Sequence, residues 1–206
     1  MTANNSIWEK RVSHGEILKL IWKNLDLGTL DRNHPFHLPA IATVENGMPR
    51  ARTVVLRRFW RKPASLAFHA HAGSPKVGQL RENPNISWLF YHPAERLQVR
   101  ISGLAEVLTD GDLHDEQRQA TDLFSRRCYI GDSPSQLSDK PTSGLPDEFL
   151  SRKPSRDQSE AGRSSFVVVR SSIDEIDCME LDVKGHRRSW FRWNTDGGLE
   201  MKWLTP

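Results

Sequence analysis

The stretch FHLPAIATVENGMPRARTVVLRRFW, residues 36–60, decides the fold because its polarity alternates with a period of two. Such alternation along a short segment is typical of a half-buried β-strand. The pair Asn46-Gly47 interrupts the stretch, and these residue types supply the positive φ values that a tight hairpin turn needs. We therefore predict a β-hairpin with one strand over Phe36–Val44 and the other over Met48–Trp60.

Further short apolar segments follow this hairpin to the end of the sequence, and Asp196-Gly197-Gly198 gives a last hairpin turn. Short strands joined by hairpins, with few helices, predict a mainly β (α+β) fold in which an antiparallel sheet curls into a barrel with peripheral helices. The further strands are predicted at Ala64–Ala70, Ile86–Tyr91, Gln98–Leu108, Ser165–Val169, Ile173–Leu181, Arg187–Trp193 and Leu199–Leu204.

Three helices are expected. Apolar residues at helical spacing over Ile7–Leu25 predict an amphipathic helix within an N-terminal segment 1–30, and Gly28 is its expected stop. Ser74 and Pro75 are good residues for the start of a short helix that reaches about Glu82. Asp110 is expected to open a third helix that ends near Arg126.

Residues 129–163 show no periodic pattern and are rich in Asp, Ser, Pro, Lys and Gly. A structureless stretch of this length is uncommon inside a compact domain. We therefore expect either a mobile loop or an extended arm at a dimer interface, ordered against the partner subunit.

The composition is that of an ordinary globular protein. The chain has 206 residues, 37% of them hydrophobic and 27% charged, which predicts a single domain over 1–206. The two cysteines are too few for a disulfide framework and favour a reducing cytoplasm. No apolar run approaches the roughly 18 residues of a membrane helix, and Met1–Lys10 does not have the pattern of a signal peptide.

Positive charge is concentrated in one segment. The formal net charge is only +3, but residues 46–81 contain eight Lys and Arg residues and no Asp or Glu. Such a segment indicates an anionic partner, which could be a phosphate ligand, a nucleic acid or an acidic surface. The alternative is a set of solvated surface cations.

Several standard sites are absent from the sequence. It contains no Gly-x-Gly-x-x-Gly, Walker, Gly-x-Ser-x-Gly or His-Glu-x-x-His motif. His69 and His71 share one face of a predicted strand, but a third ligand is not evident. We therefore expect no metal site.

Two basic segments together indicate a phosphate site. Arg52 and Arg57 bracket an apolar strand core, and a regular strand would place side chains five residues apart on opposite faces. Farther along, Ser74 and Lys76 stand at a predicted helix start, where a hydroxyl, a cation and the helix N-terminus favour an anion. Together the two segments predict a phosphorylated small ligand.

The order and spacing of several motifs resemble the pyridoxamine 5′-phosphate oxidase-like flavoproteins, over roughly residues 35–206. The resemblance implies a split β-barrel homodimer with FMN at the subunit interface and an anionic small-molecule substrate. The motifs are Arg52–Arg57, Gly73–Leu80, Asn83-Pro84, Leu97–Gly103 with Ala105-Glu106, His186-Arg187-Arg188 and Trp203–Pro206.

Within this resemblance, Arg52 and Lys76 hold the FMN phosphate, with Ser74 at the same turn. Gln98 bonds the polar edge of the flavin, although from the residues alone it is an ordinary strand residue facing solvent. Thr142 and Ser143 reach the FMN of the partner subunit, or else belong to a disordered loop. The complete cofactor set is Arg52, Thr53, Val54, Val55, Leu56, Arg57, His69, Ala70, Ser74, Lys76, Gln98, Thr142, Ser143 and Arg188, and the substrate set is Arg57 and Arg187.

The departures from the family pattern concern the substrate more than the cofactor. His69-Ala70 stands where the oxidases have Tyr-Thr, and Pro75 removes one cation from their Ser-Arg-Lys turn. Met179 replaces a tail tryptophan that packs at the cofactor, and the Arg-x-His clamp on the vitamin is not reproduced. We therefore predict that the chain is not an efficient pyridoxamine or pyridoxine 5′-phosphate oxidase.

The tail alternates cations and aromatic residues. Strand geometry places Arg188, Trp190 and Arg192 on one face, with Arg187 and Phe191 on the other. An aromatic residue between cations can cover a flavin or a substrate ring, or it can form a barrel rim with snorkelling arginines. Resemblance favours the cofactor site for Arg188, and the pattern favours the rim for Arg192.

The leading hypothesis is an FMN-binding flavoprotein that acts as an oxidoreductase on an unidentified small molecule. The alternative is a flavin-binding or carrier protein without turnover, which the altered substrate motif favours. A nucleic-acid-binding protein is a third class, and the interleaved Val54, Val55 and Leu56 argue against it because they are expected to be buried. We expect a cytoplasmic homodimer without nucleic-acid or membrane partners.

Overall fold

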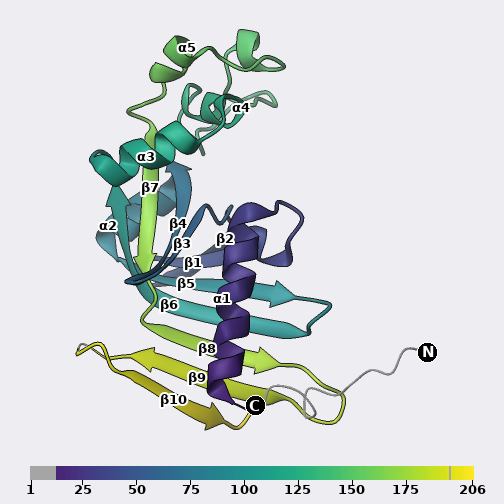
Figure 1. Cartoon of the computed structure of the whole chain (residues 1–206). Helices are drawn as coiled ribbons and strands as arrows, with labels where there is room; N and C mark the ends of the chain where they lie inside the picture. The colour runs from purple at the N-terminus through teal and green to yellow at the C-terminus, as the bar shows by residue number, and fades with distance from the viewer. Residues whose placement is uncertain (1–12, 195) are drawn as a thin grey trace. The chain divides into compact units, whose positions relative to one another are not determined.

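The structure is a computed structural model that describes residues 13–194 and 196–206 (Figure 1). Its chain divides into two compact units. Their organisation as one domain stays a prediction. The first unit contains the described residues of Met1–Ala67, Asn85–Ala105 and Ser171–Pro206, and the second contains Phe68–Pro84 and Glu106–Arg170.

Antiparallel strands form the first unit, in the order β10-β9-β8-β6-β5-β1-β2. Residues alternate between the two faces of this sheet, and Leu97, Val99 and Ile101 of β6 are all buried on one of them. Residues 64–67 of β4 pair with β3 in the same unit, whereas residues 68–71 of β4 and 106–108 of β6 belong to the second unit. The strands are β1 (Ala40–Glu45), β2 (Met48–Thr53), β3 (Arg58–Arg61), β4 (Ala64–His71), β5 (Asn85–His92), β6 (Leu97–Leu108), β8 (Glu175–Glu180), β9 (Arg187–Trp193) and β10 (Leu199–Leu204).

The predicted hairpin is confirmed, but both of its strands are shorter than expected. The prediction that the first strand begins at Phe36 is wrong, because residues Pro35–His37 form a 3₁₀ turn and β1 begins at Ala40. Asn46 and Gly47 have φ values of 51° and 77° and form the turn between β1 and β2. The prediction of one strand over Met48–Trp60 is wrong, because β2 ends at Thr53 and β3 begins at Arg58. Between them the Val54 N–H bonds to Pro39 and the Leu56 N–H bonds to His37, so this segment leaves the ladder.

Helix α1 (His14–Leu30) covers the buried face of the sheet in the first unit (Figure 1). Its Ser13 cap and Glu16 form a capping box, and the part of the predicted helix at 7–12 lies outside the described residues. The expected stop at Gly28 is wrong. A Cβ on Gly28 would lie 2.8 Å from the Phe36 carbonyl oxygen, so this glycine permits close packing and the helix continues to Leu30.

The second unit combines β7 (Phe166–Ser172) with several helices, and β4 pairs with β7. Phe166 is fully buried, and the rings of His69, His114 and Tyr129 lie 4.8, 5.2 and 4.9 Å from it. The other elements are α2 (Pro75–Glu82), α3 (Asp112–Ala120), α4 (Leu123–Arg126) and α5 (Arg156–Glu160), with 3₁₀ turns at Arg127–Tyr129 and Asp147–Phe149; a further 3₁₀ turn, Pro35–His37, lies in the first unit.

The helix expected from Asp110 to Arg126 is two helices, which corrects the sequence prediction. The Asp122 carboxylate accepts a hydrogen bond from the Phe124 N–H at 2.8 Å and so caps the start of α4. The Thr121 hydroxyl donates to the Gln117 carbonyl at 2.7 Å, at the end of α3. The direction of the chain therefore changes at Thr121-Asp122.

The segment 129–163 is an arm with local structure and several contacts to its own chain, and its expected place at a dimer interface stays a prediction. Arg118 donates to the Ser159 carbonyl at 2.7 Å, and Arg126 donates to the Ser159 hydroxyl at 3.3 Å. Arg127 donates to the Phe149 carbonyl at 2.8 Å. Three arginines of one segment thus hold the arm of the same chain.

Of the helices in the described ranges, none has the length and apolar character needed to cross a bilayer.

Candidate functional site

Arg52 lies near the end of β2, where two neighbours orient its guanidinium. Its Nη1 donates to the hydroxyl of the buried Thr43 at 2.5 Å and to the Arg50 carbonyl at 2.8 Å. Burial lowers the pKa of Arg52, and the nearby Glu45 carboxylate opposes that effect. The pairing of β1 with β2 therefore fixes where this cation sits.

The segment from Val54 to Arg57 follows the end of β2 at Thr53 without regular strand geometry. Leu56 is fully buried, and the Arg57 N–H donates to the Ala67 carbonyl at 2.9 Å. The expectation that Arg52 and Arg57 lie on opposite faces assumed an unbroken strand, and that assumption is wrong. The structure places both residues in the first unit.

The turn before α2 belongs to the second unit and has the features of an anion site. Ser74 is the N-cap residue and is buried, yet its side chain makes no capping bond. Instead its hydroxyl accepts a hydrogen bond from Lys76 Nζ at 3.3 Å. A hydroxyl and an ammonium group thus meet at the positive end of a helix dipole, where a phosphate is stabilised.

His69 and Ala70 lie on β4 just before this turn. The His69 ring lies 3.4 Å from Gln117 Oε1 and 3.4 Å from the Thr121 hydroxyl, so α3 holds its orientation. Ala70 is buried. Across the described ranges, no three His, Cys, Asp or Glu side chains come together as a metal site.

Gln98, Met179 and Arg188 form one row across three neighbouring strands of the first unit. Gln98 is opposite Met179 in the β6–β8 pair, and Met179 is opposite Arg188 in the β8–β9 pair. Residues directly opposite in an antiparallel pair project from the same face. The structure therefore brings Gln98 and Arg188 to one face, on either side of Met179.

Asp177 holds Arg188 on this face, and the sequence analysis did not identify it. Its carboxylate accepts hydrogen bonds from Arg188 Nε at 2.9 Å and Nη2 at 2.7 Å, and also from Arg100. Burial alone would raise the pKa of Asp177, but the two arginines outweigh it and the pKa is lowered. The same ion pair raises the pKa of Arg188. Its place two residues before Met179 on a predicted strand was the signal that could have found it.

Arg187 projects from the opposite face, as the alternation in the tail predicts. Arg187 is buried, and its Nε donates a hydrogen bond to the Glu180 carboxylate at 2.7 Å. The Glu180 side chain is only 1% exposed. The Trp203 ring lies 5.8 Å from its guanidinium carbon. Arg187 also lines a cavity of about 490 Å³ beside the C-terminal residues 203–206. Its charge is thus matched by a buried carboxylate.

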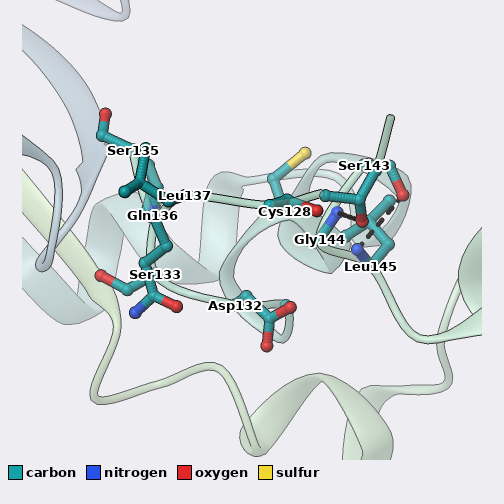
Figure 2. A pocket seen from close by; sticks show the side chains of 13 residues that line it. Cys128, Asp132, Ser133, Ser135, Gln136, Leu137, Ser143, Gly144 and Leu145 are labelled. Carbon is teal, nitrogen blue, oxygen red and sulfur yellow. Dashed lines mark hydrogen bonds between the residues drawn. The ribbon is translucent and has the colours of Figure 1, made fainter. Parts of the chain in front are cut away.

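Thr142 and Ser143 line a second cavity, of about 450 Å³, within the arm. Figure 2 shows Ser133–Leu137 on one side of it and Ser143–Leu145 with Cys128 on the other. The Thr142 hydroxyl accepts a hydrogen bond from the Gly144 N–H at 3.0 Å, and the Ser143 hydroxyl accepts one from Leu145 at 3.2 Å. Both side chains therefore brace the loop that forms the cavity.

Comparison with known proteins adds a family to this geometry. Residues 19–109 match the family model described as pyridoxamine 5′-phosphate oxidase, FMN-binding domain. The chain is 32% identical over 176 residues to the pyridoxine/pyridoxamine 5′-phosphate oxidase of Salmonella paratyphi B, a match that covers 81% of this chain and 75% of the relative. A 71-residue match to the oxidase of Vibrio campbellii is 48% identical and spans 34% of this chain and 32% of the relative. The chain thus covers only about a third of several such relatives.

Solved structures confirm the predicted split-barrel fold. A pyridoxamine 5′-phosphate oxidase-related, FMN-binding protein from Nostoc punctiforme matches with a TM-score of 0.72 and 20% identity, over 91% of this chain and 96% of that one. PhzG from Burkholderia lata, solved with tetrahydrophenazine-1-carboxylic acid, matches with a TM-score of 0.69 and 19% identity, over 97% and 96%.

Proposed function

Because the chain belongs to the pyridoxamine 5′-phosphate oxidase family, we propose that it is an FMN-dependent oxidoreductase that acts on a small anionic molecule. FMN is the cofactor of the matched domain. When bound, the flavin supplies the hydride chemistry, while the chain supplies binding, orientation and charge.

The turn at Ser74 is the observation that carries this proposal. The Ser74 hydroxyl makes no capping hydrogen bond to the helix, and it lies beside the Lys76 ammonium group. The two groups suit the phosphate of FMN, which needs hydrogen-bond donors and positive charge. Arg52 is the third proposed phosphate ligand, and its fork geometry suits bidentate binding.

The remaining proposed contacts concern the isoalloxazine ring. Gln98 and Arg188 offer donors from one face of the sheet, on either side of Met179. The backbone at Val54–Leu56 is proposed to follow the ring. Further proposed cofactor contacts are Thr53, Arg57, His69, Ala70, Thr142 and Ser143.

Arg57 and Arg187 are the proposed substrate ligands, and they differ in how much of the guanidinium is available to a substrate. Arg57 is half-buried, and burial of an arginine beside a cofactor suits an anion clamp. Arg187 already has the buried Glu180 as partner, so it would present only part of its guanidinium to a substrate. The oxidases among the relatives act on the vitamin phosphate, and we propose that this chain takes a different substrate.

The decisive experiment compares flavins. We expect FMN to bind more tightly than riboflavin, because each charged hydrogen bond to the phosphate contributes on the order of 1.5–3 kcal/mol. Arg52→Ala and Lys76→Ala should weaken FMN binding and leave riboflavin binding unchanged. Arg50→Ala, an exposed residue on the same strand, is the matched control. Equal affinity of the wild-type chain for the two flavins would contradict the proposal.

A carrier protein without turnover is the second candidate, favoured by the missing Arg-x-His clamp. The assay mixes FMN-loaded protein with pyridoxamine 5′-phosphate in air and follows pyridoxal 5′-phosphate. We expect turnover far below about 1 s⁻¹. Turnover of other small anionic amines or alcohols would support the enzyme, and a flavin reducible only by chemical reductants would support the carrier.

A further inference from the structure

Two groups of His71, its ring and its carbonyl, hold the turn that leads into α2. Its ring Nδ1 accepts a hydrogen bond from the Gly73 N–H at 3.1 Å, and its carbonyl accepts one from the Ser74 N–H at 2.9 Å. The two amides that precede the helix are therefore both bonded to one residue. This arrangement fixes the backbone on which Ser74 and Lys76 stand.

The arm of the same chain closes over this turn. The Ser133 hydroxyl lies 3.4 Å from the Gly73 carbonyl oxygen, and a Cβ on Gly73 would lie 1.9 Å from that hydroxyl. Gly73 therefore has no room for a side chain. The arm therefore contacts the turn directly at Gly73.

Burial and the charge of Lys76 both favour the neutral form of the His71 ring, which the turn requires. Burial lowers the pKa of His71, and the Lys76 ammonium group lowers it further, while the backbone of Gly131 opposes both. Only the neutral ring has an Nδ1 lone pair that can accept from Gly73. Of the charged groups in the described chain, Lys76 is the one that acts on this ring.

We propose that His71 is a positioning residue for the cofactor phosphate, which acts by holding the turn that presents Ser74 and Lys76. This inference rests on the proposed function, because it assumes that this turn meets the FMN phosphate. The inference goes beyond the proposed function because it assigns a role to His71, which would not itself donate a hydrogen bond to the phosphate.

The test is a flavin titration of the full-length chain, followed by flavin fluorescence, with FMN and riboflavin as separate probes. His71→Ala should raise the dissociation constant for FMN about tenfold, the effect of one lost hydrogen bond of roughly 1.4 kcal/mol, and change that for riboflavin less than about twofold. His71→Asn should restore FMN binding to within about threefold, because an Asn side chain can accept from the amide two residues on.

The matched control is His92→Ala. Its Nδ1 also accepts a backbone N–H, from Glu95 at 3.1 Å, but in the first unit. We expect this variant to bind both flavins as the wild-type chain does. A loss of FMN affinity in His92→Ala equal to that in His71→Ala would overturn the proposal. It would show that the effect is not specific to the turn before α2.

His71→Asp tests the same position if His71→Ala does not fold. The carboxylate keeps an acceptor for Gly73 but adds a negative charge beside the phosphate, so FMN should lose at least tenfold in affinity while riboflavin is unaffected. Unchanged FMN binding in His71→Ala, a loss of FMN affinity in His71→Asn as large as that in His71→Ala, or equal losses for FMN and riboflavin would overturn the role of His71 alone. A wild-type chain that does not prefer FMN would overturn the proposed function as well.

Discussion

Asp177 accepts hydrogen bonds from arginines on both neighbouring strands, and only 10% of its side chain is exposed. Because the arginines lower its pKa in the folded chain, its contribution to stability is present above the ordinary value of 3.8 and is lost as the pH falls through the lowered one. We predict that Asp177→Asn lowers the free energy of unfolding by about 1.5–3 kcal/mol at pH 7.

Urea unfolding of both proteins from pH 7 down to pH 3 checks this prediction. The gap between them should narrow as the pH falls below 3.8. Glu106→Gln is the control, because its pair with Arg170 is about half exposed and should contribute less than about 1 kcal/mol. A gap that stays constant over the whole pH range would show that the carboxylate charge does not carry the effect.

Arg187 and Glu180 make a second test, because both members of this pair are buried. Removing one member takes a buried ion-pair partner from the other, which typically costs about 3–5 kcal/mol. We predict a loss of that size for Arg187→Met and a smaller loss for the double variant Arg187→Met with Glu180→Met. Unfolding free energies of the two single variants and the double variant give the coupling. Additive losses would contradict the pairing.

These partners could not be predicted from the sequence, although their strand could. The segment Ile173–Leu181 was predicted as a strand, and its period of two places Asp177 and Met179 on one face. Which cations stand opposite them depends on strand register, and register is set by pairing over long sequence separations. The proposed cofactor residues were predicted from ordered motifs. The role of His71 could be inferred only from its hydrogen bond with Gly73.

Helix and strand boundaries show the same limit. The Asn46-Gly47 turn was predictable because both residues favour positive φ locally, but the break after Thr53 comes from bonds to the segment at 37–39. Ser13 and Glu16 form a capping box at the start of α1, but the apolar spacing over Ile7–Leu25 did not locate that start. The prediction that the helix ends at Gly28 was wrong, because glycine is used for close packing as well as for helix termination.

The arm gives a prediction about local order. Arg118 is 2% exposed and donates to Ser159 and Glu160 of α5, so it ties the arm to α3. We predict that Arg118→Met lowers the hydrogen-exchange protection of residues 156–163 by about 10- to 100-fold, the effect of losing charged hydrogen bonds on a locally opening segment. Exchange measured by mass spectrometry checks this.

Arg152→Met is the matched control for the arm, because its pair with Glu148 lies on the surface. A surface pair of this kind contributes little, so protection should change less than about threefold. Protection in the sheet strands should be unchanged in both variants. Equal loss of protection throughout the chain in Arg118→Met would mean that the arginine supports the whole fold and not the arm.

One face of the sheet in the first unit leads to the last prediction. Leu89, Tyr91, Leu104 and Leu204 are 43%, 47%, 54% and 37% exposed, and their strand partners place them on the face that carries Gln98 and Arg188. Exposed apolar side chains that gather on one surface mark an interaction site. Two-fold pairing of identical chains is the commonest way to cover such a surface.

We therefore predict a homodimer, with twice the chain mass of 23.6 kDa in sedimentation equilibrium. Leu104→Asp places a charge on this face and should shift the chain to the monomer, whereas Val183→Asp, at an 88% exposed position, should leave the dimer intact. Since the proposed cofactor residues Gln98 and Arg188 share the face, the monomeric variant should also bind FMN more weakly. A wild-type chain that is monomeric with FMN bound would contradict both the dimer and this coupling, and a monomeric Leu104→Asp with full FMN affinity would separate the cofactor site from the interface.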